Sequence, residues 1–175
     1  MVSGSVLIPA GLWWRVGAFL IDAAVLGVLH QVLLYTIDLN IPDLEQLMGL
    51  KDRIMAEIIA TATLSTGLLN ETNVILAPLR FACWLNVATC AAYFTVFHGM
   101  LGASLGKLCL GLTVLRRDGT PLGYGLAFLR YLGYLIVAKA AYTAWLIWFN
   151  AERRTLYDMI LGTNVFRAAP QDKMQ

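Results

Sequence analysis

The sequence predicts an all-α integral membrane protein with three main hydrophobic helices, interfacial helices and a short β-hairpin. The 175 residues are 59% hydrophobic and 14% charged, and their mean hydropathy is +0.68. Ordinary soluble domains are about 45–50% apolar and about 25% charged. Three long apolar runs, two of them bordered by aromatic residues, account for the excess. We expect residues 1–175 to form a single domain embedded in a lipid bilayer.

Several classes of protein are excluded by the same composition. A net charge of +2 gives no reason to expect nucleic acid as a partner. Disordered chains need low hydrophobicity and much charge, which this chain does not have. The cysteines Cys83, Cys90 and Cys109 have no C-x-x-C spacing, so they indicate neither a disulfide framework nor a zinc site. We therefore expect no cofactor and no bound metal.

The first predicted span covers residues 16–37. Its 22 residues would extend about 33 Å as a helix, enough for a hydrocarbon core of about 30 Å. Trp13 and Trp14 precede the run and Tyr35 lies near its end, as interfacial anchors do. A cleaved signal peptide is the competing interpretation, but the run is long and contains Asp22. We expect a retained helix.

The second predicted span is about 77–98, and the third is about 124–149 with tryptophans near its far end. A cytoplasmic connection, 99–123, joins them. The first two spans are separated by an acidic segment, 38–76, which carries six acidic and two basic residues. Within this segment Pro42-Asp43 opens a helix with apolar residues at helical spacing. A short helix on or beneath the membrane surface is the simplest interpretation.

The positions of lysine and arginine predict which side each connection faces. Arg15 and the connection 99–123 belong in the cytoplasm, so the N-terminus is cytoplasmic and 38–76 lies outside. The basic residues of the tail, such as Arg167, also favour the cytoplasm, although three complete spans would place the tail outside. Either the third segment is bent or re-entrant, or 58–76 adds a partial crossing, or the rule fails here.

Ionisable residues within the predicted spans are the candidates for function. Asp22 lies seven residues after Arg15, so both side chains project from nearly one helix face about 10 Å apart. An aspartate at this depth costs several kcal/mol unless it is paired, hydrated or protonated. It is either an ion or proton site, or part of a buried pair that orients helices. Both interpretations stay open on the sequence alone.

Two basic residues of the third segment also need an explanation. Lys139 lies near mid-span, where pairing with Asp22 or Asp158 is the expected outcome. Arg130, near the start of the segment, is expected to extend to the cytoplasmic surface.

Other polar and small residues of the chain give weaker signals. His30 and His98 lack a third ligand at metal spacing, so we expect packing roles for them. Gly102 and Gly106, four residues apart, either allow close helix approach or mark turns, and their place in a connection favours turns. The sequence contains no catalytic set that we can assemble, and we expect no enzymatic activity.

Three blocks of the sequence resemble the RDD family of small prokaryotic membrane proteins. They are A-G-L-W-W-R-V-G-A-F-L-I-D (10–22), S-L-G-K-L-C-L-G-L-T-V-L-R-R-D-G (104–119) and E-R-R-T-L-Y-D-M-I-L-G-T-N-V (152–165). The arginine and two aspartates for which the family is named map onto Arg15, Asp22 and Asp158. Tyr157 stands where members often carry histidine, so a proton-transfer role for that histidine cannot be carried over.

The resemblance implies an integral protein of a prokaryotic inner membrane, in a family in which some members look like sodium–proton antiporters. It also implies that 112–115 and 163–166 pair as β segments, which would return the tail to the cytoplasmic side. We predict a cation- or proton-coupled transporter that binds sodium ion or a proton and acts as a homo-oligomer. Its candidate ion- and proton-binding residues are Arg15, Asp22, Asp158 and Lys139. The alternative is a structural or assembly subunit without transport activity.

Overall fold

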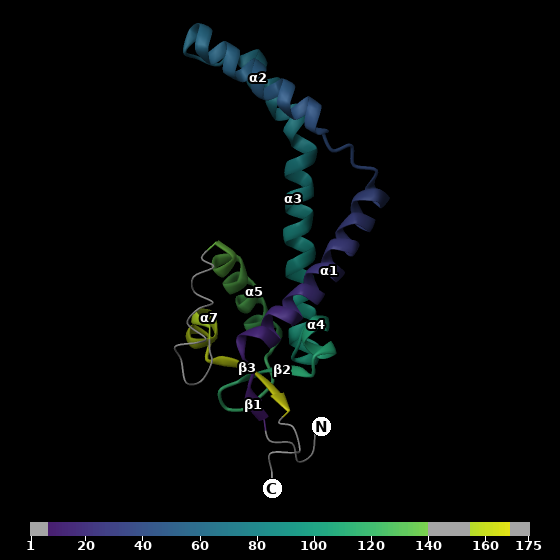
Figure 1. Cartoon of the computed structure of the whole chain (residues 1–175), viewed down its shortest axis with the longest axis vertical. Helices are drawn as coiled ribbons and strands as arrows, with labels where there is room; N and C mark the ends of the chain where they lie inside the picture. The colour runs from purple at the N-terminus through teal and green to yellow at the C-terminus, as the bar shows by residue number, and fades with distance from the viewer. Residues whose placement is uncertain (1–6, 140–154, 169–175) are drawn as a thin grey trace. The chain divides into compact units, whose positions relative to one another are not determined.

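The computed structural model describes residues 7–139 and 155–168. In this part of the chain helices dominate, in the order β1 (Leu7–Pro9), α1 (Leu12–Ile37), α2 (Leu44–Thr61), α3 (Thr66–Leu101), α4 (Leu105–Cys109), β2 (Leu112–Arg116), α5 (Tyr124–Lys139), α7 (Leu156–Ile160) and β3 (Thr163–Ala168) (Figure 1). The chain divides into two compact units, one of residues 1–27 with 89–175 and the other of residues 28–88.

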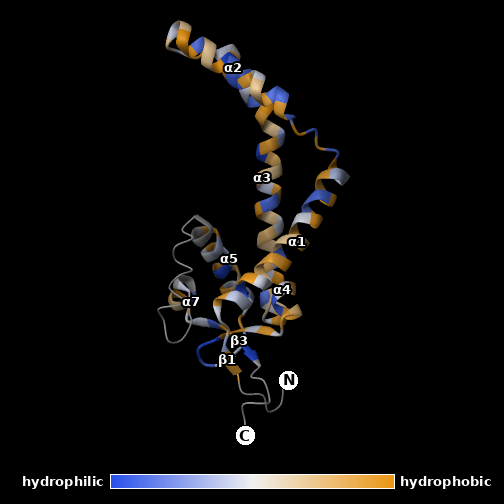
Figure 2. Cartoon of the chain, in the orientation of Figure 1, coloured by the Kyte–Doolittle hydropathy of each residue, from blue (hydrophilic) through white to orange (hydrophobic). Residues whose placement is uncertain are grey.

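Two helices are long and apolar enough to cross a membrane, and these are α1 and α3. The first contains the run expected over 16–37 and begins four residues earlier, at Leu12. The second contains the segment expected over 77–98 but begins eleven residues earlier, at Thr66. Pro78 lies inside it and leaves the carbonyl of Val74 without its usual helical partner. Apolar residues cover much of both helices in the hydropathy colouring of Figure 2.

Of the three main helices that the sequence predicts, two are long and apolar enough to cross a membrane, and the third is not confirmed as a span within the described residues. Over 124–149 the structure has the helix α5, which ends at Lys139, and residues 140–149 lie outside the described part of the chain. The expected helix in the acidic segment is confirmed as α2. Asp43 is its N-cap and accepts from the backbone N–H of Gln46 at 2.8 Å, and Gln46 accepts in return from the backbone N–H of Asp43.

A small antiparallel sheet with the strand order β1-β3-β2 organises the unit that contains both chain ends. β3 pairs with β2 from Thr163 opposite Arg116 to Arg167 opposite Leu112, which confirms the pairing expected between 112–115 and 163–166. The pairing is not a local hairpin, because 46 residues separate the two strands along the chain. β1 joins the other edge of β3, with Leu7 opposite Ala168; this strand was not predicted from the sequence.

The apolar core of this unit lies beneath the sheet. Its buried members come from α1, β2 and β3 and from the loops after β1 and before α5: Ala10, Ala18, Leu112, Val114, Leu122 and Val165. Small residues on α1 bring that helix close to α4. A Cβ atom on Gly106 would lie 2.1 Å from the carbonyl oxygen of Ala18, so only glycine fits at this contact. The core thus fixes the first turns of α1 against the sheet and α4.

Candidate functional site

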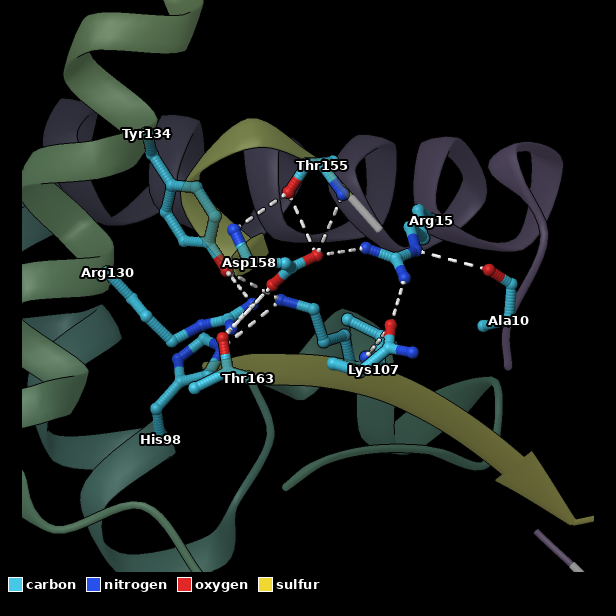
Figure 3. Close-up of polar contacts among 11 residues, drawn as sticks. Ala10, Arg15, His98, Lys107, Arg130, Tyr134, Thr155, Asp158 and Thr163 are labelled. Atoms are coloured by element: carbon cyan, nitrogen blue, oxygen red, sulfur yellow. Dashed lines mark hydrogen bonds and ion pairs between the residues drawn. The ribbon is translucent and has the colours of Figure 1, made fainter. Parts of the chain in front are cut away.

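Two buried aspartates of the same unit form the candidate site, and the structure surrounds them differently. Asp158, on α7, is fully buried and lies between two arginines (Figure 3). Arg15 Nη1 donates to its Oδ2 at 2.6 Å, and Arg130 Nη1 donates to its Oδ1 at 2.6 Å. Arg15 comes from the first turn of α1 and Arg130 from α5. One carboxylate therefore joins three helices that are far apart in the sequence.

Threonines complete the surroundings of Asp158. The hydroxyl of Thr155 donates to Oδ2 at 2.8 Å, and that of Thr163 donates to Oδ1 at 3.2 Å. Arg130 Nη1 also donates to the Thr163 hydroxyl. We call Arg15, Arg130, Thr155, Asp158 and Thr163 the Asp158 cluster. In this geometry the buried carboxylate accepts hydrogen bonds from both charged donors and neutral donors.

The charge of Asp158 is stabilised strongly by this cluster. Burial on its own would raise the pKa of the carboxyl, but Arg130 and Arg15 outweigh it and lower the pKa from 3.8 to about 2. Asp158 is therefore ionised at any physiological pH. A carboxylate held by two arginines is suited to joining helices and is poorly suited to exchanging a proton.

Asp22, in contrast, is surrounded by neutral groups. It lies on α1 and is 2% exposed. Its Oδ1 accepts from the hydroxyl of Tyr93 at 2.7 Å and from the backbone N–H of Gly106 at 2.7 Å. Its Oδ2 accepts from the hydroxyl of Ser104 at 2.6 Å. We call Asp22, Tyr93, Ser104 and Gly106 the Asp22 site. Within residues 7–139 and 155–168 the structure records no ion pair for Asp22.

A buried lysine lies beside the Asp158 cluster. Lys107 Nζ donates to Tyr134 Oη at 3.3 Å and contacts His98 Nε2 at 3.1 Å. The other ring nitrogen of His98, Nδ1, lies 2.9 Å from the carbonyl oxygen of Phe94, which can only accept. His98 Nδ1 therefore carries the hydrogen, and Nε2 accepts from Nζ of Lys107. Tyr134 Oη also accepts from Arg130 at 3.5 Å, which links this contact to the Asp158 cluster.

The structure brings some of the predicted site residues together and separates others. Arg15 and Asp158 form an ion pair, whereas Arg15 makes none with Asp22 among the described contacts. The prediction that Arg130 reaches the cytoplasmic surface is wrong: the side chain is fully buried, because Asp158 offers it a second carboxylate oxygen. Lys139 is the last described residue of α5, and its side chain lies outside the part that the structure describes.

Tyr93, Ser104, Lys107 and the site role of Arg130 were not predicted from the sequence. The signal for Ser104 and Lys107 was available in the block 104–119, where both flank Gly106. Of the two glycines expected to mark turns, Gly102 does so with φ +68°, but Gly106 serves close packing. Tyr93 carried no signal, because a tyrosine in an apolar helix is ordinarily a packing residue.

Helices α1 and α3, each long and apolar enough to cross a membrane, are the features typical of the class of integral membrane proteins. A model of the RDD family matches residues 9–162, nearly the whole chain. The chain therefore belongs to the RDD family, as its three sequence blocks predict.

Comparison with other proteins adds one relative and no structural template. The chain is 24% identical over 162 residues to the uncharacterized protein YxaI of Bacillus subtilis (strain 168), an alignment that covers 90% of this chain and 96% of the relative. No solved structure matches the chain. The similarity extends over nearly the full length of both chains.

Proposed function

We propose that this RDD protein is a cation- or proton-coupled transporter in which Asp22 is the ion-binding carboxylate. The observation that carries the proposal is the burial of Asp22, 2% exposed on an apolar helix of 26 residues, with neutral hydrogen-bond donors at its oxygens. A buried ionised group costs several kcal/mol unless it is compensated. A proton or a bound cation supplies that compensation.

The chemistry of the Asp22 site suits such an exchange. Each hydroxyl of Tyr93 and Ser104 has one O–H donor and two lone pairs, so it can rotate to donate to a carboxylate or to face a cation. Carboxylate and hydroxyl oxygens are hard donors of the kind that hard cations prefer. Competition between a proton and a cation for one carboxylate is sufficient to couple their movements.

The Asp158 cluster has a different role in this proposal. Arg15 and Arg130 each pair with Asp158 at 2.6 Å, so its charge is already compensated. We therefore assign Arg15 and Asp158 to holding α1, α5 and α7 together rather than to ion binding. The expected pairing of Lys139 with Asp22 or Asp158 stays a prediction, since its side chain is not among those described.

The sheet supports a topology with β1, β2 and β3 on one side of the membrane. Backbone groups at sheet edges are not tolerated in lipid, so β1, β2 and β3 belong together on one side. The connections on that side carry Lys107, Arg116 and Arg117, which favours the cytoplasm. We propose a multi-pass inner-membrane protein whose N-terminus is cytoplasmic and whose segment 124–149 bends or re-enters instead of crossing once.

The alternative is a structural or assembly subunit, and one observation favours it. Three hydrogen bonds already satisfy the carboxylate of Asp22, and Gly106 packs against its helix too tightly for a Cβ atom. A carboxylate held in this way can specify the packing of α1 against α4 without binding an ion.

Ion flux in proteoliposomes distinguishes the two functions. Purified protein is reconstituted, a pH gradient is imposed, and the fluxes of sodium and potassium are recorded. Transport by the parent protein should be lost in Asp22→Asn and kept in Asp52→Asn, a control at an exposed acid. Both variants are first checked for a monodisperse elution profile. Unchanged flux in Asp22→Asn removes this carboxylate from the mechanism, and a parent protein silent to sodium, potassium and protons leaves the structural function.

A further inference from the structure

Lys107 is a buried basic residue that the function proposed for Asp22 does not use. It lies on α4 and is 8% exposed. Its Nζ donates to Tyr134 Oη at 3.3 Å and to His98 Nε2 at 3.1 Å. It takes part in none of the ion pairs recorded for the described residues. A buried ammonium group is costly unless a negative charge compensates it, so the source of that charge has to be found.

Positive charges outnumber negative charges among the described residues around Lys107. Arg15 and the completely buried Arg130 share the carboxylate of Asp158. Both guanidinium groups stay charged in a protein. His98 is neutral, because its Nδ1 carries the hydrogen and its Nε2 accepts from Lys107. An ammonium group on Lys107 therefore adds a positive charge that Asp158 does not compensate.

Tyr134, on α5, is an acidic group placed between two of these cations. Its Oη accepts from Lys107 Nζ at 3.3 Å and from Arg130 Nη2 at 3.5 Å. Both cations also lie beside its ring, with Lys107 Nζ 5.4 Å and Arg130 Cζ 6.0 Å from the ring centroid. Figure 3 shows the three side chains converging beside Asp158. A negative charge on Oη would therefore be stabilised by two cations at once.

The chemistry of an amine beside a phenol allows the proton to leave the oxygen. In water the pKa of a lysine amine is about 10.4 and that of a tyrosine phenol is about 10, so the amine is the stronger base. Arg130 favours the phenolate further, because it adds a second positive charge beside Oη. When the O–H bond of Tyr134 breaks, Nζ of Lys107 carries the proton and the pair has no net charge. Asp158 opposes the phenolate, but two guanidinium groups already pair with it.

We propose that Tyr134 is a proton-binding site, which at neutral pH is a phenolate held by Lys107 and Arg130. Uptake of one proton from water converts the phenolate to a phenol and leaves Lys107 without its anionic partner. Lys107 directly follows Gly106, whose backbone N–H binds Asp22, so the short helix α4 carries a contact to each site. The assignment of Tyr134 does not rest on ion transport at Asp22.

Ultraviolet absorption tests the proposal in the full-length protein, because a phenolate absorbs at longer wavelength than a phenol. At neutral pH the spectrum of the parent minus that of Tyr134→Phe should contain the phenolate band of a single tyrosine, and acidification should remove this band. Tyr124→Phe, at an exposed tyrosine of the same helix, is the matched control and should keep the band. Equal phenolate absorption in the parent and in Tyr134→Phe would overturn the proposal.

Variants of Lys107 separate the effect of its charge from that of its packing. Lys107→Met removes the cation but keeps an unbranched side chain, so the affinity of the phenolate for a proton should rise about tenfold or more. This change is measured as a shift of the midpoint of the phenolate band to higher pH. Lys107→Arg keeps the charge and should keep the midpoint close to that of the parent. A midpoint that is the same in Lys107→Met and in the parent would contradict the proposal.

Nuclear magnetic resonance of the parent protein gives a measurement that needs no variant. The chain has seven tyrosines, and with carbon-13 at their Cζ atoms one resonance should have the chemical shift of a phenolate at neutral pH. If every resonance has the chemical shift of a phenol, the assignment of Tyr134 is wrong. A gain in thermal stability on addition of chloride would in that case assign the compensating charge to a bound anion.

Discussion

Removing the charge of Asp158 should destabilise the protein far more than removing the charge of an exposed acid. Asp158→Asn leaves the guanidinium groups of Arg15 and Arg130 without their carboxylate, and Arg130 is completely buried. Breaking a buried ion pair from one side costs about 3–5 kcal/mol. The matched control is Glu71→Gln, because Glu71 pairs with Arg53 at the same 2.6 Å but is 42% exposed. The control should cost less than about 1 kcal/mol.

Reversible unfolding in mixed micelles measures both values. The free energy of unfolding is obtained for the parent, for Asp158→Asn and for Glu71→Gln at one pH and one detergent concentration. The difference between the two variants should exceed about 2 kcal/mol. Equal stabilities for the two variants would show that Arg15, Arg130 and Asp158 do not form a buried network, and the assignment of Asp158 to joining helices would be wrong.

Three further predictions follow from the same unit. The pKa of Asp158 falls from 3.8 to about 2 on folding, so its ion pairs stabilise the protein fully above pH 3.8 and progressively less as the pH falls toward 2. Over this interval the free energy of unfolding of the parent should fall by about 2 kcal/mol more than that of Asp158→Asn. Parallel pH dependences of the two proteins would contradict this prediction. Gly106→Ala should lower the free energy of unfolding by about 1–3 kcal/mol in the same assay, because the new Cβ atom would meet Ala18. Gly27→Ala on α1 is the control: its Cβ atom would meet no other atom, so the free energy of unfolding should stay the same or rise. Single cysteines at Asp118 and Arg167 should react with a membrane-impermeant maleimide from the same face of oriented vesicles, and reaction from opposite faces would exclude the proposed topology.

The sequence predicted the elements that depend on local signals. The apolar lengths of 16–37 and 77–98 predicted two spans because hydrocarbon thickness sets a minimum helix length. The pair Pro42-Asp43 predicted the start of α2, since capping uses neighbouring residues. The resemblance of the three sequence blocks to the RDD family predicted the pairing of β2 with β3. It also identified Arg15, Asp22 and Asp158 as the residues to examine.

The sequence could not predict which charge pairs with which. Arg15 and Asp22 lie on nearly the same face of one helix, and this spacing suggested that Arg15 influences Asp22. Arg15 instead pairs with Asp158, 143 residues further along the chain. That choice depends on where the sheet places α7, and no local pattern encodes it. For the same reason Arg130 was expected at a surface, because its acidic partner lies on a different helix.

The position of β3 in the middle of the sheet has a consequence for how the protein is made. Leu7 pairs with Ala168, so the N-terminal strand has no partner until residues 163–168 have left the ribosome. By that time α1 and α3 have been synthesised and are available for insertion, whereas Arg15 has no ion pair with Asp158 until residue 158 has been synthesised. Sheet closure and the joining of α1 to α7 are therefore late, post-insertion events of biogenesis. A nascent chain stopped before residue 155 would hold its membrane helices without the contacts that connect them to the sheet.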